Sequence, residues 1–362
     1  MFFIKAVLFY IQEGNITLTV ALDAMGGDNA PGEIIRGAVN ALSVCEDLSI
    51  IIVGVESRVN ACLKDLRYPE DRVRVVHAPD IISGFDDPGI AVRRKKLSSM
   101  VVALKLVSSG SADAFVGAGN TGAIMAGGLL FMGRVPGVSR PALLATIPGF
   151  RGDPSVVLDV GANMDASPEQ LLQYSFMGTL FAKEVLKRNE PSVSLLNVGT
   201  EPNKGNIASK ATFSLLEQYM PSFKGNVEGT QVFDGISDVI VCDGFVGNIF
   251  LKSTEAIFRE VFLALKNDLS KNFKSKIGVN LIYGSIREIY KKIDDSQFGG
   301  APLVGVNGIC VKCHGSSNSQ SIKNAIINTV YPLVSGSVPQ KLERLLLKQN
   351  CTYKELKGNE LE

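Results

Sequence analysis

Short runs rich in valine, isoleucine and leucine recur along the chain, separated by stretches with helical spacing. They lie at residues 18–22, 49–53, 73–77, 114–116, 155–160, 193–198 and 239–242. Such runs are typical of strands buried on both faces of a sheet, and their alternation with helices favours parallel pairing. The pattern therefore predicts a three-layer α/β fold, with a mostly parallel sheet between helices.

Small and polar residues follow five of these runs. The segments are DAMGGDNAPGE, GAGNTGA, DVGANMDASPEQ, NVGTEPNKGN and CDGFVGN. In open α/β sheets, ligands bind outside the carboxyl ends of the strands, where helix N-termini present free N–H groups and a positive dipole end. We therefore expect all five turns at one edge of the sheet, around a crevice that binds an anion.

Composition excludes several classes of function. The 362 residues carry a net charge of +1, so there is no basic field for nucleic acid. With 46% apolar residues, the chain can bury a sizeable core.

Six scattered cysteines form no disulfide framework, which favours a reducing cytoplasm. No run approaches the ~20 apolar residues of a membrane span. The opening MFFIKAVLFYIQEGN lacks the cleavage site of a signal peptide.

No linker, internal repeat or low-complexity segment divides the sequence. We expect residues 1–16 to form an N-terminal extension and residues 17–338 a single α/β catalytic domain. Within that domain, residues 250–292 form an amphipathic helical region by their spacing. Residues 339–362 are expected to form a C-terminal helix and a charged tail.

The segment ICVKCHGSSNSQ contains C-x-x-C-H at Cys310, Cys313 and His314, a pattern that attaches c-type haem in exported proteins. The only other histidine is His77, and nothing marks out a methionine as an axial ligand. A structural zinc site lacks its second pair of ligands. Haem and zinc are therefore both disfavoured, and the two cysteines are interpreted as small strand residues.

The turn GAGNTGA lets the backbone approach a ligand closely, with Asn120 and Thr121 at an expected helix start. A tight turn without a ligand is the alternative. The turn does not match the P-loop pattern G-x-x-x-x-G-K-[ST], and GGDNAPGE does not match the dinucleotide pattern G-x-G-x-x-G. These mismatches count against an ATPase and against an ordinary NAD site.

The turn HGSSN follows GAPLVGVNGICVKC, which resembles one buried strand with glycine interruptions, and precedes SIKNAIINTV, which has helical spacing. Its serines either cap the helix or bind an anion. His314 is either a structural residue or a donor to a phosphate or an oxyanion. Lys312 faces either the same pocket or solvent.

Taken together and in this order, the turns resemble the acyl-ACP:phosphate acyltransferase family of bacterial phospholipid synthesis, the PlsX type. The matching segments are ALDAMGGDNAPGE, RKKLSSM, GAGNTGAIMAGGLLFMGRVPGVSRPALLATIP, LDVGANMDASPEQLLQYSFMGTLFA, LLNVGTEPNKGN, DGFVGNIFLKSTEA and FGGAPLVGVNGICVKCHGSSN. Two positions depart from the family pattern: Asn29 stands where many members carry His or Phe, and Cys313 stands where Ser is common. The second departure accounts for the haem-like pattern and makes Cys313 a poor candidate for an essential nucleophile.

The resemblance implies transfer of a long acyl chain from acyl carrier protein to inorganic phosphate, giving acyl phosphate for phosphatidic acid synthesis. It implies an isopropylmalate dehydrogenase-like, Rossmann-like fold and a homodimer that needs no cofactor or metal. The implied location is the cytoplasm, with peripheral association at the inner face of the membrane. A membrane glycerol-3-phosphate acyltransferase is the implied partner there.

The residues and the resemblance together define a set of expected site residues. The expected catalytic residues are His314, Asn120 and Lys312. The expected phosphate-binding or substrate-binding residues are Asp23, Gly26, Gly27, Lys96, Ser98, Ser99, Gly119, Thr121, Asn163, Asp165, Asn248, Gly315, Ser316 and Ser317. Because much phosphate is already a dianion at neutral pH, the enzyme's tasks are to hold it near the thioester carbonyl and to stabilise the oxyanion.

Each group has a hypothetical role in this scheme. The phosphate cradle is expected from Asn120, Thr121, Ser316 and Ser317. His314 donates to the oxyanion or protonates the leaving thiolate, while Lys96 or Lys312 supplies positive charge. Asn163 and Asp165 order the pocket, although Asp165 can equally cap the helix that follows it.

Two segments suggest partner surfaces. The densest basic run, RRKK at residues 93–96, suits an acidic carrier protein or is a solvated loop. In the region 250–292, one helical face carries Phe258, Phe262, Leu265 and Leu269. Nearby basic residues are Lys271, Lys274, Lys276, Arg287, Lys291 and Lys292. This region can rest on an anionic membrane, form a dimer interface or belong to the core.

Two other functions stay open. One is a short-chain phosphate acyltransferase that uses coenzyme A. The other is a catalytically silent regulatory protein that binds an anion on the same fold.

Overall fold

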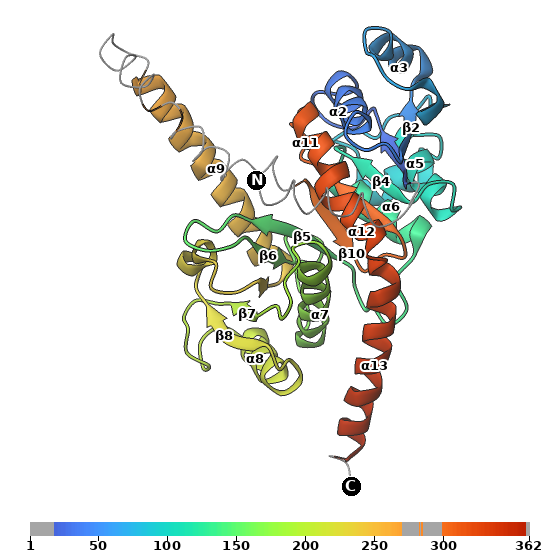
Figure 1. Ribbon diagram of the computed structural model, residues 1–362. Helices are drawn as coiled ribbons and strands as arrows, with labels where there is room; N and C mark the ends of the chain where they lie inside the picture. The colour runs from blue at the N-terminus through green and yellow to red at the C-terminus, as the bar shows by residue number, and fades with distance from the viewer. Residues whose placement is uncertain (1–17, 270–281, 283, 285–298, 360–362) are drawn as a thin grey trace.

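The computed structural model describes residues 18–269, 282, 284 and 299–359. Its strands form an eleven-stranded sheet in the order β3-β2-β1-β4-β11-β10-β5-β6-β9-β7-β8 (Figure 1). The strands are β1 Leu18–Asp23, β2 Leu48–Gly54, β3 Val73–His77, β4 Ala114–Gly117, β5 Ala142–Ile147, β6 Ser155–Leu158, β7 Val193–Leu196, β8 Phe223–Val227, β9 Val239–Val241, β10 Ala301–Val304 and β11 Ile309–Lys312. All seven predicted strands are present, and the predicted α/β class is confirmed.

The first five strands in this order, from β3 to β11, pair in parallel. Val20 of β1 lies opposite Ile50 on one side and Ala114 on the other. Alternate residues of β1 belong to two cores: Val20 packs into one, and Ala21 packs into the other. Because both faces of β1, β2 and β4 are covered, these strands are mostly apolar, which made them recognisable in the sequence, whereas the edge strand β3 is only partly buried.

Strands β10 and β5 interrupt the parallel order. β10 is antiparallel to β11 and to β5, and β5 is antiparallel to β6. The group β6, β9, β7 and β8 is parallel within itself and therefore runs opposite to the first group. The expectation that five turns share one edge is wrong. β1 and β4 end at one edge of the sheet, whereas β6, β7 and β9 end at the other.

The segment GAPLVGVNGICVKC is a hairpin, so its prediction as one strand is wrong. Ala301 of β10 pairs with Lys312 of β11 across it. Gly305 has φ +98 in the connection, a value that residues with a Cβ rarely adopt. The sequence analysis also missed β5 and β8. β5 contains two alanines and β8 reads FKGNV, and such residues weaken a strand signal.

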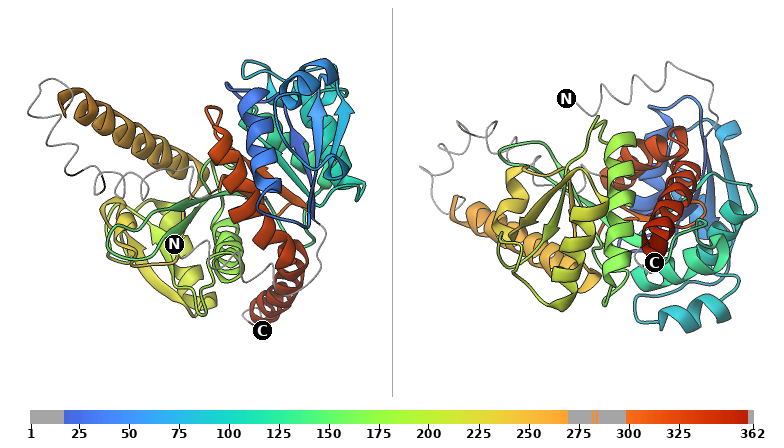
Figure 2. Two further views of the ribbon diagram at one scale, coloured as in Figure 1. Left: turned by 45° about the horizontal axis from the view of Figure 1, so that its top comes forward. Right: turned by 90° about the horizontal axis from the view of Figure 1, so that it is seen from below.

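Helices lie on both faces of the sheet (Figure 2). The described α-helices are α2 Gly32–Leu42, α3 Glu56–Leu63, α4 Pro88–Arg94, α5 Ser99–Ser108, α6 Thr121–Gly127, α7 Pro168–Glu184, α8 Ile207–Tyr219, α9 Gly244–Leu269, α11 Ser319–Asn324, α12 Tyr331–Ser335 and α13 Val338–Asn359. The π-helical segments are η2 Gly128–Met132 and η5 Ala325–Val330, and the 3-10 segments are η1 Glu70–Arg72 and η3 Gly229–Asp234. α11 lies beside α2, where the backbone N–H of Ser319 donates to Glu33 at 2.8 Å.

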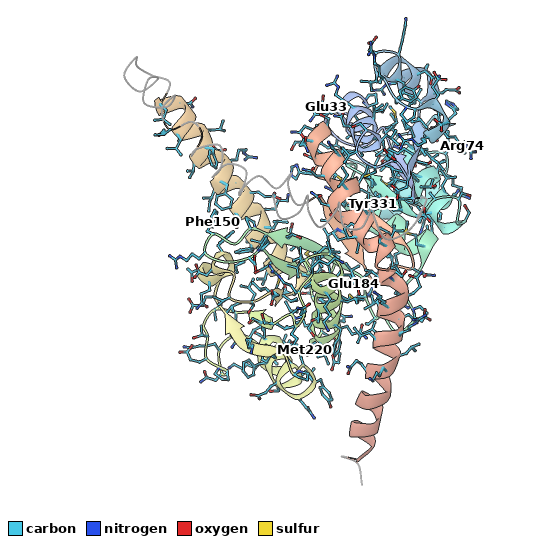
Figure 3. The ribbon with its side chains drawn as sticks, viewed as in Figure 1. Glu33, Arg74, Phe150, Glu184, Met220 and Tyr331 are labelled. Atoms are coloured by element: carbon cyan, nitrogen blue, oxygen red, sulfur yellow. The ribbon has the colours of Figure 1, made fainter. Side chains whose placement is uncertain are left out.

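The predicted C-terminal helix is present as α13, which packs along α7. Leu342 and Leu346 of α13 are buried, and Lys341 forms an ion pair of 2.7 Å with Glu184, labelled in Figure 3. The end of the predicted charged tail, residues 360–362, lies outside the described residues, as does the predicted extension 1–16.

Helix α9 projects away from the sheet beyond its first turns (Figure 1). Near the middle of α9, Phe258 contacts the rings of Phe150 and Phe233 edge-on, at centroid distances of 5.9 and 5.8 Å. Ile257 and Val261 are 61% and 50% exposed. The predicted basic residues between 271 and 292 lie outside the described residues. Within the described part of the chain, no helix has the length and apolar character that crossing a membrane requires.

Candidate active site

A cavity of about 570 Å³ lies between the turns that follow β4 and β11 and the first turns of α9. The predicted site residues that line it are Thr121, Asn248, Lys312, His314, Ser316 and Ser317. Two charged lining residues were not predicted, Lys252 and Glu255 of α9. The structure therefore brings together residues from distant parts of the sequence, including both halves of the sheet.

Parallel pairing of β4 with β11 places two predicted turns side by side. Lys312 lies opposite Gly117 in the register, and the backbone N–H of Cys313 donates to the Gly117 carbonyl oxygen at 2.8 Å. HGSSN and GAGNTGA therefore leave the sheet next to each other at the same edge. The phosphate-cradle hypothesis draws on both turns, and the register places them side by side.

Lys312 is half-buried at the end of β11 and lines the cavity, so the alternative in which it faces bulk solvent is wrong. Burial lowers the pKa of Lys312. The neighbouring Lys252 lowers this pKa further, whereas Glu255 and Asp28 raise it. A partly desolvated ammonium group attracts an anion more strongly than one in water does.

His314 connects the HGSSN turn to α9. Its Nδ1 lies 2.7 Å from the Ser316 hydroxyl and 3.2 Å from the Ser316 backbone nitrogen, which donates to it. Its Nε2 lies 3.5 Å from Lys252 Nζ and 4.0 Å from Glu255 Oε2. Lys252 and Glu255 form an ion pair of 2.7 Å. The imidazole therefore lies between a polar turn and a charged helix face.

The HGSSN turn is held in place by the turn after β1. The side-chain amide of Asn29 donates to the carbonyl oxygens of Ser316 and Ser317 at 3.0 and 3.2 Å. The backbone N–H of Asp28 donates to Gly315 at 2.8 Å. The sequence marked Asn29 only as a departure from the family pattern and assigned it no role.

The serines of HGSSN do not cap the following helix, so that alternative is wrong. Asn318 is the N-cap of α11, and its side chain accepts from the backbone N–H of Ser321 at 2.9 Å. The Ser316 side chain lies in the cavity lining beside His314. Ser317 also lines the cavity, although the residue is mostly buried.

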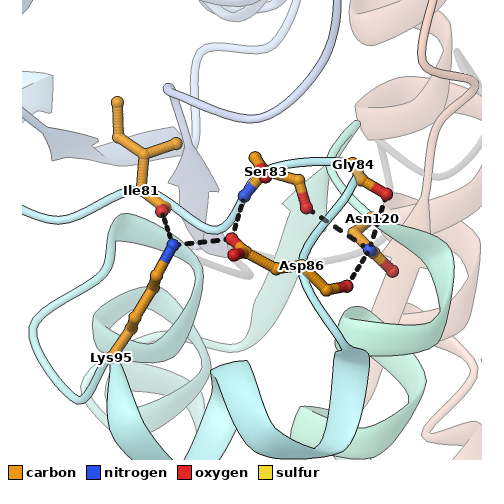
Figure 4. Close-up of polar contacts among 6 residues, drawn as sticks. All are labelled: Ile81, Ser83, Gly84, Asp86, Lys95 and Asn120. Carbon is orange, nitrogen blue, oxygen red and sulfur yellow. Dashed lines mark hydrogen bonds and ion pairs between the residues drawn. The ribbon is translucent and has the colours of Figure 1, made fainter.

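Asn120 organises a loop and is not among the residues that line the cavity. It caps α6, accepting from the backbone N–H of Ala123 at 3.0 Å. Its amide nitrogen donates to the carbonyl oxygens of Ser83, Gly84 and Asp86, each at 3.3 Å (Figure 4). Both ends of the side chain are thus engaged within the protein, next to the cavity residue Thr121.

The predicted residues around Asp23 form a buried cluster behind the cavity. Asp23 is almost fully buried and accepts hydrogen bonds from the backbone of Met25 and Gly26 and from the Ser99 hydroxyl. Burial raises the pKa of this carboxyl group, although these hydrogen bonds act the other way. A Cβ on Gly26 would lie 2.8 Å from the backbone of Gly119, so glycine is required for this approach.

Three other predicted binding residues also lie outside the cavity lining. Ser98 caps α5. Gly27, in the turn after β1, packs closely on Ala118, because an added Cβ would lie 3.0 Å from the Ala118 side chain. Lys96 is exposed to solvent. Ser98 therefore has a capping role and Gly27 a packing role, and Lys96 makes no contact with the cavity.

A second buried carboxylate, Asp159 after β6, was not predicted. It accepts hydrogen bonds from the backbone of Leu143, Gly161 and Ala162 at 2.9–3.1 Å, and from Asn163 at 2.6 Å. Burial raises the pKa of Asp159 despite these bonds. The signal was present in the sequence, because Asp159 interrupts the apolar run at residues 155–160 near its carboxyl end.

Asn163 supports this arrangement, since its amide also donates to Asp159 at 3.0 Å and to the Pro141 carbonyl oxygen at 2.7 Å. Asp165 is exposed and does not cap α7, so that alternative is wrong. Ser167 is the N-cap, in a capping box with Gln170. The turn after β6 thus orders the cavity wall at Gly161 and does not place Asn163 or Asp165 in the lining.

The C-x-x-C-H pattern has no geometry for a shared ligand. Cys310 and Cys313 are both 1% exposed and pack into different cores of the sheet. Burial raises the pKa of both thiols to about 12, so they stay protonated and are poor nucleophiles. Among the described residues, no group of three or more His, Cys, Asp or Glu side chains is arranged to hold a metal ion.

The cavity thus combines a partly buried ammonium group, an imidazole and hydroxyl groups at one end with apolar side chains elsewhere. The apolar lining residues include Met125, Leu143 and Leu251. The polar end suits an oxyanion, and the apolar walls suit a hydrocarbon. The spacing of Asn248, Lys252 and Glu255, at intervals of four and three residues, was the available signal that α9 presents one polar face to the site.

Comparison with known proteins gives a consistent result. A family model described as fatty acid synthesis protein matches residues 18–340. A phosphate acyltransferase of Halothermothrix orenii is 45% identical over 332 residues, which cover 90% of this chain and 99% of the relative. A phosphate acyltransferase of Brevibacillus brevis is 42% identical over 339 residues, which cover 92% of this chain and 100% of the relative.

Two solved structures share the fold. A phosphotransacetylase from Streptococcus pyogenes has a TM-score of 0.58 at 15% identity, covering 92% of this chain and 98% of that chain. A branched-chain phosphotransacylase from Enterococcus faecalis has a TM-score of 0.53 at 15% identity, covering 87% of this chain and 99% of that chain. At this identity the likeness shows the fold alone.

Proposed function

Because the chain belongs to the fatty acid synthesis protein family, whose relatives are phosphate acyltransferases, we propose that it transfers a long-chain acyl group from acyl carrier protein to inorganic phosphate. The chain is an acyltransferase of this family, and the acyl carrier donor and the chain length are the proposed part. The observation that carries the proposal is the meeting of Lys312, His314 and Ser316 at one end of a partly apolar cavity.

Phosphate is proposed to bind at the polar end of the cavity. Lys312 supplies positive charge from the end of β11, and the hydroxyls of Thr121 and Ser316 supply hydrogen bonds. Holding phosphate beside the thioester replaces a bimolecular encounter with an oriented one, which can lower the barrier by several kcal/mol. The proposed phosphate cradle therefore consists of Thr121, Lys312, Ser316 and Ser317. Asn120 supports Thr121 from outside the lining.

The reaction proceeds by attack of a phosphate oxygen on the thioester carbonyl carbon. A C–O bond forms and the carbonyl electrons move to oxygen, giving a tetrahedral oxyanion. The C–S bond then breaks and its electron pair leaves with sulfur. The proton of HPO₄²⁻ balances the proton taken up by the thiolate, so the products are acyl phosphate and a free thiol. His314 is proposed to donate to the oxyanion or to the sulfur, and one oxyanion donor contributes about 3 to 4 kcal/mol.

The acyl chain is proposed to lie against the apolar walls of the cavity. Met125, Leu143 and Leu251 come from α6, β5 and α9 and line the same space as His314. Because these walls come from both halves of the sheet, we propose that residues 17–338 act as a single catalytic unit. Acyl phosphate released from this site is proposed to serve phosphatidic acid synthesis.

The partner surfaces are proposed from exposed side chains. Arg93, Arg94 and Lys96 are exposed and suit an acidic carrier protein. The exposed apolar residues of α9, such as Ile257 and Val261, suit a second copy of the chain or a membrane surface. We propose a homodimer in the cytoplasm that associates peripherally with the inner face of the membrane, close to a glycerol-3-phosphate acyltransferase.

The test is formation of acyl phosphate from phosphate and a thioester, trapped by hydroxylamine. Palmitoyl carrier protein, palmitoyl coenzyme A and acetyl coenzyme A would be compared as donors. Preference for the carrier-bound long chain supports the proposal, and preference for acetyl coenzyme A supports the short-chain alternative. Lys312→Met should abolish formation, whereas Lys210→Met, on the exposed face of α8, should not. No product with any donor would indicate a silent binding protein.

A further inference from the structure

The turn after β11 favours one tautomer of His314. The backbone N–H of Ser316 points at Nδ1 from 3.2 Å, and a backbone N–H can only donate. While this bond is kept, Nδ1 acts as an acceptor, and in a neutral imidazole the proton then lies on Nε2. The Ser316 hydroxyl, at 2.7 Å from Nδ1, can rotate to donate as well.

Helix α9 presents two opposite charges to Nε2. Lys252 Nζ lies 3.5 Å from it and Glu255 Oε2 lies 4.0 Å from it. An ammonium group can only donate, so Lys252 by itself favours an unprotonated Nε2. Glu255 accepts from Lys252 at 2.7 Å and presents a carboxylate to the Nε2 edge. Among the residues that the structure describes, Lys312 of β11 and Asp28 of the turn after β1 also bring charge close to this turn.

We propose that Glu255 is a positioning residue that binds Lys252 and thereby keeps the proton of neutral His314 on Nε2. The role of His314 follows, and this part rests on the proposed acyl transfer to phosphate. A neutral imidazole with Nδ1 already accepting from the backbone has no lone pair left to act as a base. Giving up its proton would leave an anion, so it is also a poor general acid. His314 instead donates a hydrogen bond from Nε2 to the developing oxyanion.

Of the two roles open to His314, donation to the oxyanion or to the leaving sulfur, the Nε2–H tautomer favours the first. No proton leaves the imidazole during the reaction. The proton that ends on the thiol comes from phosphate, through solvent. The carboxylate of Glu255 touches neither phosphate nor thioester in this scheme, since it acts through Lys252 and the imidazole.

The tautomer is directly measurable, because the chain has only two histidines. Nitrogen-15 labelling of histidine and two-bond proton–nitrogen couplings, at about pH 8 where histidine is ordinarily neutral, report which ring nitrogen carries the proton. His77 is an internal reference: its Nδ1 accepts from the Glu56 backbone N–H at 3.2 Å, so it should also carry its proton on Nε2. The spectra would be compared for the parent, Glu255→Gln, and Glu255→Gln combined with Lys252→Met.

We expect the parent to show the Nε2–H tautomer, Glu255→Gln to shift His314 towards Nδ1–H, and the added Lys252→Met to restore Nε2–H. His77 should not change in any of them. Glu260→Gln is the matched control, because it removes the same charge from an exposed pair with Arg259 on the same helix. Glu255→Gln should also lower kcat about tenfold or more with little change in the KM for phosphate, while Glu260→Gln should leave both unchanged.

An Nδ1–H tautomer in the parent, or a Glu255→Gln spectrum like that of the parent, would overturn the assignment. If Glu255→Gln does not fold, Glu255→Asp provides the second test. Its shorter carboxylate should give a mixture of tautomers, and a pure parent-like state would again overturn the assignment. If the parent tautomer is Nε2–H but no donor gives acyl phosphate, the proposed function fails while the arrangement of Ser316, Glu255 and Lys252 stands.

Discussion

The side chain of Asn29 donates a hydrogen bond to the backbone carbonyl oxygen of Ser316 at 3.0 Å, which ties the turn after β1 to the turn that carries His314. A second bond from the same amide reaches Ser317. Neither residue is near Asn29 in the sequence, and the contact exists because β1 and β11 both pair with β4.

Replacement of Asn29 by alanine should therefore affect both stability and catalysis. Loss of two hydrogen bonds is expected to lower the free energy of unfolding by about 1 to 3 kcal/mol. The rate should fall because His314 and Ser316 are no longer held in register. Urea unfolding and the hydroxylamine assay measure the two effects. Asn40→Ala, at an exposed position on α2, is the control and should change neither.

Replacement of Asn120 by alanine separates capping from the loop contact. The lost cap should lower the free energy of unfolding by about 1 kcal/mol. The loop at residues 83–86 should also exchange its amide hydrogens faster, because three carbonyl contacts are lost. Asn206→Ala removes an equivalent cap from α8, away from the cavity lining. Equal loss of activity in both variants would show that Asn120 affects catalysis no more than any other lost helix cap does.

The buried carboxyl group of Asp23 should make stability depend on pH. Burial raises the pKa of Asp23 above the ordinary value of 3.8, so the native state keeps a proton that the unfolded chain loses. Stability is therefore lost as pH rises from 3.8 towards the higher folded value, and the loss persists above it. Asp23→Asn should show a smaller fall in the free energy of unfolding between about pH 4 and pH 7. The exposed Asp165→Asn control should retain the parent's pH dependence.

Cys313 should be dispensable for the chemistry. Burial raises the pKa of its thiol to about 12, and the side chain packs in the core although it reaches the cavity wall. Cys313→Ala is expected to keep kcat within about threefold of the parent and to lower stability by about 1 kcal/mol. Alkylation of the native protein at about pH 8, followed by mass spectrometry, should modify the half-buried Cys62 before Cys310 or Cys313. A more than hundredfold loss of kcat in folded Cys313→Ala would contradict this.

The two sides of α9 should respond differently to polar substitution. Ile257→Ser with Val261→Ser alters exposed positions and should reduce association with anionic vesicles, or with a second copy, while stability changes little. Phe258→Ser removes a ring that contacts Phe150 and Phe233 and should lower the free energy of unfolding by about 2 to 4 kcal/mol. Vesicle sedimentation, light scattering and urea unfolding measure these quantities. Unchanged association in the double variant would mean that this face is not the contact surface.

The sequence by itself determined the α/β class, most strands and the family. Strands such as β1 and β2 were recognisable because burial on both faces favours apolar residues at most positions. It also placed Lys312, His314 and Ser316 correctly at one strand end, since the local strand-to-helix transition specifies that position. Capping was less certain, because Ser167 and Asp165 are both plausible caps until the backbone defines the first helical turn.

Tertiary structure alone decided the rest of the site. Reversal of the second half of the sheet depends on how β10 and β5 pair, and strand direction is not encoded in an apolar run. The contacts of Asn29 with Ser316, and of Lys252 and Glu255 with His314, join residues far apart in the chain. Hydrogen bonds and ion pairs act over only a few ångströms, so these contacts are fixed by the packing of whole elements and not by local sequence.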